Sequence, residues 1–160
     1  MVEVGDIKKF ELFGVLSEKQ LDKIAKITDK KSFKKGVHIY EKGDRAKEMH
    51  VVLKGLVSLR EINPGDEVGI GFESRERGEF FGAACFMKPQ EYTLTAVCME
   101  NSEVLAVNAE KLFDICEQDP GIGYQLMTKV AQIYFDRYKV AKRQIYQMVK
   151  TPTVITALPG

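Results

Sequence analysis

The side chains that most often carry metal or nucleophilic chemistry are few in this sequence and stand far apart. Three cysteines (Cys85, Cys98 and Cys116) and two histidines (His38 and His50) occur among 160 residues. No two cysteines have the CxxC spacing of a zinc ribbon, and no G-x-S-x-G motif marks a serine nucleophile. The sequence therefore predicts no catalytic residue and no metal ligand set, and we expect a protein that is not an enzyme.

Two sharper hypotheses can still be placed on these residues. The histidines lie in a strand-rich region, as in metal-binding cupins, but Tyr40 stands where the second histidine of an H-x-H pair would be. Cys85 could serve as a redox or haem sensor if it lay near the start of a short helix, where a thiolate is favoured. Histidines without a metal and buried, inert thiols are the alternative.

Composition and charge narrow the class of protein. Hydrophobic residues make up 44% of the chain and charged residues 29%, as in ordinary soluble proteins. No apolar run reaches about 18 residues, so we expect no membrane span. The acidic N-terminus does not fit a signal peptide. Because the cysteines are odd in number and scattered, reduced thiols and a cytoplasmic location are expected.

Positive charge gathers near the C-terminus. Residues 129–150 hold six basic side chains against one acid, although the whole chain has a formal net charge of only +1. A solvated helix face is one interpretation of this segment. An acidic protein partner, a membrane surface or nucleic acid is the other.

The spacing of apolar residues divides the chain into a helical start, a strand-rich middle and a helical end. A capping box at Ser17 and Gln20 predicts a helix over 21–27, and a shorter helix is expected over 7–13. Short β-branched runs between glycine turns, at roughly ten-residue spacing, favour a β-barrel or jelly roll. The strands are expected at 37–40, 49–53, 56–62, 67–72, 92–99 and 103–107.

The helical end begins at two capping signals. Asn108 is expected to cap a helix over 109–116, and Asp119-Pro120 to begin a helix of nearly 30 residues that stops at Thr151-Pro152. Such a helix spans about 45 Å, which is longer than a small barrel needs to cover itself. Part of its apolar face is therefore expected to pair with a second copy. The alternative is a helix folded back on its own barrel.

Four short segments, three of them with glycine turns, follow one another in a recognisable order. They are 33–44 with Gly36 and Gly43-Asp44, the strand–glycine–strand segment 49–59, Gly78-Glu79-Phe80-Phe81-Gly82, and Thr95-Ala96-Val97. With the flanking helices, they make residues 6–150 resemble the cyclic-nucleotide-binding domain family, especially the sensor part of catabolite-activator-type transcription regulators. In that family, the last two segments enter and leave the phosphate-binding cassette.

The resemblance implies a fold and an assembly. The fold is a mainly β double-stranded β-helix (jelly-roll) barrel with N-terminal helices and a long C-terminal helix. The expected domains are a cyclic-nucleotide-binding-like unit over 1–118, a dimerisation helix over 119–150 and a tail over 151–160. Ten residues after Lys150 leave no room for the helix-turn-helix that follows in those regulators. We therefore expect a homodimer without a DNA-binding domain in this chain, either as a stand-alone sensor or as part of a truncated regulator.

The cassette departs from the family at two positions. The family's ribose-binding glutamate is replaced by Ala83 and its phosphate-binding arginine by Leu94, while Thr95 keeps a hydroxyl. Losing both partners would cost about 3–6 kcal/mol, or roughly 10²–10⁴ in affinity. Binding of cyclic AMP or cyclic GMP in the usual mode is therefore not expected.

The seven residues of the predicted ligand site are those that would line the altered cassette. They are Gly82, Ala83, Ala84, Cys85, Leu94, Thr95 and Ala96. Such small, apolar walls fit either an uncharged or weakly polar effector or a filled core without a ligand. No cofactor is indicated beyond such a small-molecule effector.

The sequence thus predicts a non-enzymatic regulatory module that senses a ligand and signals through its long helix. One alternative is the sensor domain of a transcription regulator that answers to another effector. The other is a structural domain that binds a protein partner, which would keep its dimer and its partner after an Ala83→Leu substitution filled the pocket.

Overall fold

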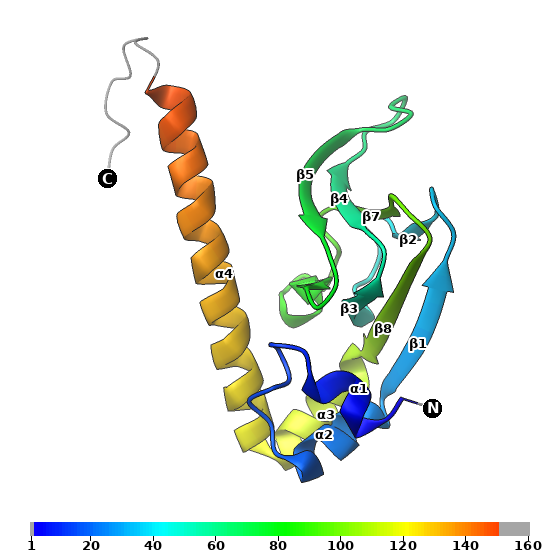
Figure 1. The fold of residues 1–160 in the computed structure, drawn as a ribbon, viewed down its shortest axis with the longest axis vertical. Helices are drawn as coiled ribbons and strands as arrows, with labels where there is room; N and C mark the ends of the chain where they lie inside the picture. The colour runs from blue at the N-terminus through cyan, green and yellow to red at the C-terminus, as the bar shows by residue number, and fades with distance from the viewer. Residues whose placement is uncertain (1, 151–160) are drawn as a thin grey trace.

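The computed structural model describes residues 2–150, which form a two-sheet body with helices at its base and one long helix beside it (Figure 1). The elements in chain order are α1 (Val4–Lys8), α2 (Glu18–Ala25), β1 (Thr28–Phe33), β2 (His38–Tyr40), β3 (Glu48–Lys54), β4 (Val57–Glu61), β5 (Ile70–Arg75), β6 (Phe80–Phe81), the 3-10 helix η1 (Ala83–Phe86), β7 (Thr95–Cys98), β8 (Ser102–Asn108), α3 (Ala109–Gln118) and α4 (Pro120–Val149). The predicted tail over 151–160 lies outside the described residues.

Two antiparallel sheets of four strands form the body. Their strand orders are β1-β8-β3-β6 and β2-β7-β4-β5, so neighbouring strands come from distant parts of the chain, as in a jelly roll. Long pairings such as Thr28 with Val107 and Glu48 with Asn108 fix the register of the first sheet. The strands that the sequence predicted are all present, with β5 shifted towards its C-terminal end.

The structure corrects two parts of the predicted fold class. The sheets are not closed into a barrel, because β6 has only two residues and pairs with β3 alone. The edge strand β5 pairs with β4, and no ladder joins the two sheets. The fold is also mixed rather than mainly β, since α4 by itself contains 30 residues.

The strands β3 and β8 of the first sheet are buried on both faces, which explains their continuous apolar runs. On one face, Met49 and Leu105 join a cluster that includes Leu21 of α2 and Leu126 of α4. On the other face, Val52 and its neighbours meet residues of the second sheet. Each large apolar side chain that is buried contributes about 1.5–3 kcal/mol. Burial on both faces therefore fixes this sheet between the helices and the second sheet.

The short helices at the base confirm their predicted caps. The Ser17 hydroxyl accepts a hydrogen bond from the Gln20 amide, and the Gln20 side chain accepts one from the Ser17 amide. The Asn108 side chain accepts from the Lys111 amide at the start of α3. The first helix, predicted over 7–13, instead covers Val4–Lys8.

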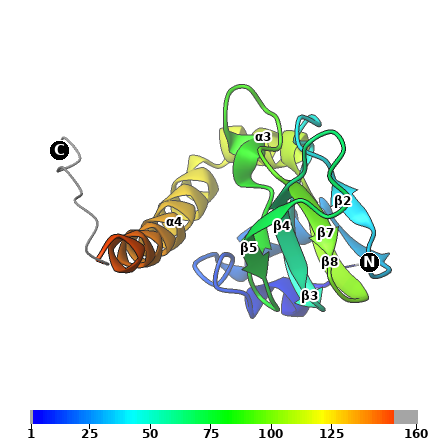
Figure 2. The same ribbon diagram turned by 90° about the horizontal axis from the view of Figure 1, so that it is seen from above.

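The long helix α4 begins at Pro120, as predicted, and ends at Val149. Its first half packs on the base through Ile122, Leu126 and Val130. Beyond Arg137 it extends away from the sheets, and the view from above shows its C-terminal end well clear of the body (Figure 2). The alternative of a helix folded back on its own body therefore describes α4 as far as Arg137 and not the exposed residues 138–149.

Candidate functional site

The cassette begins with a glycine that no other residue could replace without strain. Gly82 has φ of 80°, and a Cβ built there would lie 3.1 Å from the Glu48 carbonyl oxygen and 3.3 Å from Nδ1 of His50. The chain then forms the single 3-10 turn η1, in which Ala83 and Cys85 are buried. This local geometry fits a tight approach of the cassette to β3.

Cys85 does not have the environment of a reactive thiol. Its side chain is buried in the cluster on the helix-facing side of the first sheet, and burial raises the pKa of the thiol to about 12. A protonated thiol is a poor nucleophile and a poor metal ligand. The stabilised thiolate hypothesised from a helix start is therefore corrected, because desolvation outweighs the effect of a single short turn.

The other predicted site residues lie in different surroundings. Ala84 packs with Cys85, whereas Leu94 and Ala96 join the apolar cluster between the two sheets. Thr95 points to the opposite side of β7 and accepts a hydrogen bond from the Lys42 amide at 3.1 Å. The seven residues thus divide among two packed clusters and one cavity, and their role in ligand binding stays a prediction.

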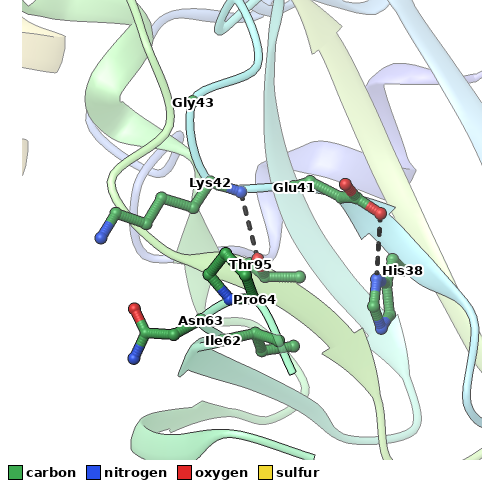
Figure 3. A pocket seen from close by; sticks show the side chains of 8 residues that line it. All are labelled: His38, Glu41, Lys42, Gly43, Ile62, Asn63, Pro64 and Thr95. Atoms are coloured by element: carbon green, nitrogen blue, oxygen red, sulfur yellow. Dashed lines mark hydrogen bonds and ion pairs between the residues drawn. The ribbon is translucent and has the colours of Figure 1, made fainter. Parts of the chain in front are cut away.

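Thr95 opens onto a cavity of about 370 Å³ between the β2–β3 turn and the β4–β5 turn (Figure 3). His38 Nδ1 lies 3.4 Å from Glu41 Oε1 at its rim, and the Lys42 ammonium pairs with Glu61. The cavity is lined by His38, Glu41, Lys42, Gly43, Ile62, Asn63, Pro64 and Thr95. Because His38 meets Glu41 and Lys42 pairs with Glu61, the described lining offers no unmatched charge to a ligand.

Stacked rings fill the interior beside the cassette. Tyr40 stacks on Tyr92 with 3.5 Å between ring centroids, and His50 stacks on Phe81 at 5.0 Å. The Tyr92 hydroxyl donates to the Glu48 carbonyl at 2.7 Å and accepts from its amide at 3.2 Å. The rings therefore join β2, β3, β6 and the cassette into one packed unit.

His50 is a deeply buried ionisable side chain of this unit, with 2% of its surface exposed. Its Nε2 lies 3.4 Å from the Glu48 carboxylate, while its Nδ1 has no hydrogen-bond partner. Burial lowers the pKa of His50, so the ring is neutral near pH 7. The His50 side chain, and then Lys31, hold the pKa of Glu48 at about 2 despite partial burial.

An arginine is the one buried residue of β5. Arg75 is 5% exposed at the end of a strand whose other five residues are exposed. Its Nε donates to the Phe80 carbonyl at 3.2 Å and its Nη1 to the Ser74 carbonyl at 2.8 Å, and Nη2 pairs with Glu73. A buried guanidinium with this many directed bonds fixes the turn that leads from β5 into β6.

A second arginine reaches the same carbonyl oxygen from α4. Arg137 Nη2 donates to the Phe80 carbonyl at 3.3 Å, and the guanidinium lies over the rings of Phe80 and Tyr134, 4.9 and 5.2 Å from their centroids. Phe80 and Tyr134 meet edge to face at 5.8 Å. These contacts tie the middle of α4 to the strand that enters the cassette.

Sequence reasoning missed Arg75 and Arg137 as members of a site. Arg75 stands at the end of a strand just before a glycine turn. A charged residue at such a place is normally expected to be exposed, so its sequence position gave no reason to place it in a site. Arg137 was visible only as an interruption of the apolar pattern of the long helix. Neither pattern shows that the two side chains meet, because 62 positions separate them in the sequence.

No metal centre can be built from the described residues. Within residues 2–150, no three histidine, cysteine, aspartate or glutamate side chains gather closely enough to hold an ion. His38 is exposed on β2 and His50 is buried on β3. In the same part of the chain, no helix is long and apolar enough to cross a membrane.

Comparisons with a family model and with solved structures identify relatives that share this fold. The family model "Cyclic nucleotide-binding domain" matches residues 30–119. The structure is similar to a putative cyclic nucleotide-binding protein from Geobacter metallireducens, with a TM-score of 0.78, 27% identity and coverage of 86% of this chain and 99% of that one. No curated protein sequence matches the chain.

Two regulators share the fold at lower identity. The sensor domain of the transcriptional regulator DNR from Pseudomonas aeruginosa has a TM-score of 0.68 and 18% identity, with 95% of each chain covered. The catabolite activator protein of Thermus thermophilus also has a TM-score of 0.68, at 21% identity, covering 87% of this chain and 63% of that one. At these identities the likeness concerns the fold.

Proposed function

The chain belongs to the cyclic nucleotide-binding domain family, and from that premise we propose that it is a non-enzymatic regulatory module that senses a small molecule. The observation that carries the proposal is the contact between α4 and the entry to the cassette. Arg137 of α4 donates to the carbonyl of Phe80, two residues before Gly82. A ligand that changes the packing of the cassette would thereby change the docking of α4, which is a two-state coupling.

The effector we propose is not a cyclic nucleotide bound in the usual mode. Ala83 and Leu94, at the positions of the family's glutamate and arginine, have no hydrogen-bonding side-chain groups. Lys88, the nearest basic residue in the cassette, is exposed, and a flexible ammonium cannot form the bidentate fork of an arginine.

A thermal titration tests this proposal. We expect the unfolding temperature to stay constant with cyclic AMP and cyclic GMP up to millimolar concentration, as it would with 5′-AMP, the matched control. A ligand at 100 times its dissociation constant would add about 2.7 kcal/mol of stability. A saturable rise with either cyclic nucleotide, absent with 5′-AMP, would overturn the exclusion and make the protein a nucleotide sensor.

The second half of α4 supports a homodimer. Its exposed side chains Tyr134, Tyr138, Ala141, Ile145 and Met148 follow one another at alternating steps of four and three. That spacing places them along one seam, as in a two-stranded coiled coil. The occupant we propose for this seam is the same helix of a second copy. Sedimentation velocity over a range of concentrations should show a reversible dimer, and a monomer at all concentrations would contradict it.

A second candidate function is the sensor domain of a transcription regulator with a different effector. It is favoured by the fold shared with the sensor domain of DNR, whose length this chain matches almost completely. Intact-mass measurement of the protein from its native source distinguishes the two candidates. A mass well above 18.1 kDa, with a helix-turn-helix sequence after Gly160, would favour the regulator.

A further inference from the structure

Two guanidinium groups meet where β5, β6 and α4 come together, and their donors outnumber the acceptors around them. Arg75 and Arg137 both donate to the Phe80 carbonyl oxygen, at 3.2 and 3.3 Å. Arg75 reaches two further acceptors, the Ser74 carbonyl and Glu73. Two guanidiniums offer about ten N–H donors, so most of this capacity has no partner among the described residues.

Few acceptors contact these two charges directly. Glu73 pairs with Arg75 and is itself half-exposed, whereas Glu73 and Glu79 act on Arg137 without an ion pair among the described residues. Because both guanidiniums donate to one carbonyl oxygen, two like charges lie close together, and burial, then Arg75, lower the pKa of Arg137. Nη1 of Arg137 is buried and has no hydrogen-bond partner. An additional acceptor at this place would satisfy that donor.

The surroundings link the arginine pair to the cassette. Charges on Arg75 act on the hydroxyls of both Tyr40 and Tyr134, and Arg137 acts on Tyr134. Phe80, whose carbonyl accepts from both arginines and whose ring meets Tyr134, lies two residues before Gly82, so the arginine pair stands at the entry to the cassette.

We propose that Arg75 and Arg137 together bind an oxyanion group of the effector, either a carboxylate or a phosphate. This inference rests on the proposed sensing function and names the chemistry of its ligand. The cassette arginine is replaced by Leu94, and the positive charge comes instead from β5 and α4. Planar guanidiniums match both oxyanions with paired hydrogen bonds.

The position of Arg137 would make such binding a signal. From Tyr138 to Val149 every residue of α4 is exposed, so Arg137 is the last point at which the helix is held by the body. One hydrogen bond to Phe80, with the rings of Phe80 and Tyr134 beneath it, keeps its guanidinium in place. An anion that takes over this guanidinium would exchange that bond for a stronger charge-assisted one and would reset the docking of α4.

Arginine side-chain NMR on the ¹⁵N-labelled 160-residue protein tests the proposal. The Nε–Hε signals are followed during separate titrations with inorganic phosphate and with succinate, at an ionic strength held constant with sodium chloride. We expect the Arg75 and Arg137 signals to shift with one shared, saturable dissociation constant. The probe that binds at the lower concentration identifies the group, and no saturable shift with either probe would overturn the site.

Matched variants separate this site from general charge effects. Arg137→Gln should weaken binding at least about tenfold, the effect of losing one charged hydrogen-bonding partner. Arg143→Gln removes the same charge from an exposed position of the same helix and should leave binding unchanged. Equal weakening by both variants would overturn the proposal, because it would mean unspecific attraction.

Two further outcomes of these measurements distinguish a failure of the anion site from a failure of the proposed function. An intact dimer whose arginine signals ignore both anions would refute the anion site alone. Saturable anion binding that leaves the amide signals of 138–149 unchanged would leave the site standing and refute its regulatory role. We expect both sets of signals to move together in the wild-type protein.

Discussion

Several large apolar side chains of α4 are buried in the body of the molecule, residues 2–137. In residues 138–149, which we call the far half of α4, side chains of the same kind are exposed. In the body, Ile122 and Leu126 of α4 are buried in the main core. In the far half, Ile145 and Met148 are 55% and 78% exposed. One continuous helix therefore changes from a core element to a free surface, and the change occurs at Arg137.

This difference shows that the number of apolar residues in a helix does not by itself determine which of them are buried. A strand of five to seven residues spans roughly 20 Å, whereas the 30 residues of α4 span about 45 Å. The sheets and base helices are too short to cover such a helix. The body therefore leaves the far half uncovered, which is why most of the proposed dimer seam, from Tyr138 onward, is placed there.

The largest expected effect comes from truncating the docked half. Leu126→Ala should lower the free energy of unfolding by about 2–5 kcal/mol, because it leaves a cavity in the main core. Met148→Ala, the matched change in the far half, should stay within about 0.5 kcal/mol when measured at concentrations where the protein is monomeric. Urea unfolding checks both. Similar losses from the two variants would break the comparison between body and far half.

A smaller effect is expected at the entry to the cassette. Gly82→Ala must place a side chain at φ of 80° and 3.1 Å from the Glu48 carbonyl oxygen. Gly36→Ala has a similar φ of 84° but nothing within 4 Å, so it isolates the backbone cost of about 1–2 kcal/mol. The unfolding free energy should fall further for the Gly82 variant. Equal losses would show that the close approach to β3 is relieved at no cost.

The next effect is a pH dependence that belongs to the body. Because burial lowers the pKa of His50 in the folded protein, the unfolded chain binds a proton below about pH 6.5 that the folded chain does not. The free energy of unfolding should therefore fall as the pH decreases below that value. Urea unfolding between pH 7.5 and 5 should show this slope in the wild-type protein.

Two variants assign the slope to its residue. His50→Phe keeps a ring stacked beside Phe81 and should flatten the pH dependence in this range. His38→Gln, at an exposed position of β2, should retain it. If the slope survives His50→Phe, another group titrates and the interior is less sealed than the burial of His50 implies.

Local patterns predicted the helix starts well, and non-local pairing explains what was missed. Ser17 and Gln20, Asn108, and Asp119-Pro120 each act within one turn of chain, so the sequence alone identifies them. The polar strand β1 was not predicted, because its pairing partners in β8 lie 69–79 positions away and only that pairing makes it a strand. The prediction of a closed barrel was wrong for a similar reason, because the length of β6 depends on the strands beside it.

The candidate site shows the same division. The unusual Ala83 and Leu94 could be read directly from the motif, whereas the convergence of Arg75 and Arg137 depends on how α4 docks. A buried arginine on an otherwise exposed strand contradicts the ordinary preference of charged residues for solvent. Sequence reasoning applies that preference by default, so exceptions at functional positions are the residues it finds last.

The smallest expected effect on stability, and the sharpest test of the far half, comes from Ile145→Glu. A charge in the middle of the proposed seam should dissociate the dimer, because two buried carboxylates would face each other across it. The body should unfold as before, within about 0.5 kcal/mol, since Ile145 contributes nothing to its core. Sedimentation velocity and urea unfolding of the same samples measure both quantities.

Gln144→Glu is the matched control, because it adds the same charge one residue earlier at an exposed position off the seam. It should leave the dimer intact. If both variants dimerise like the wild type, the seam at 134, 138, 141, 145 and 148 is not the pairing surface. If Ile145→Glu also destabilises the body, the far half is part of the folded core in solution. That result would contradict the difference in burial between the two regions.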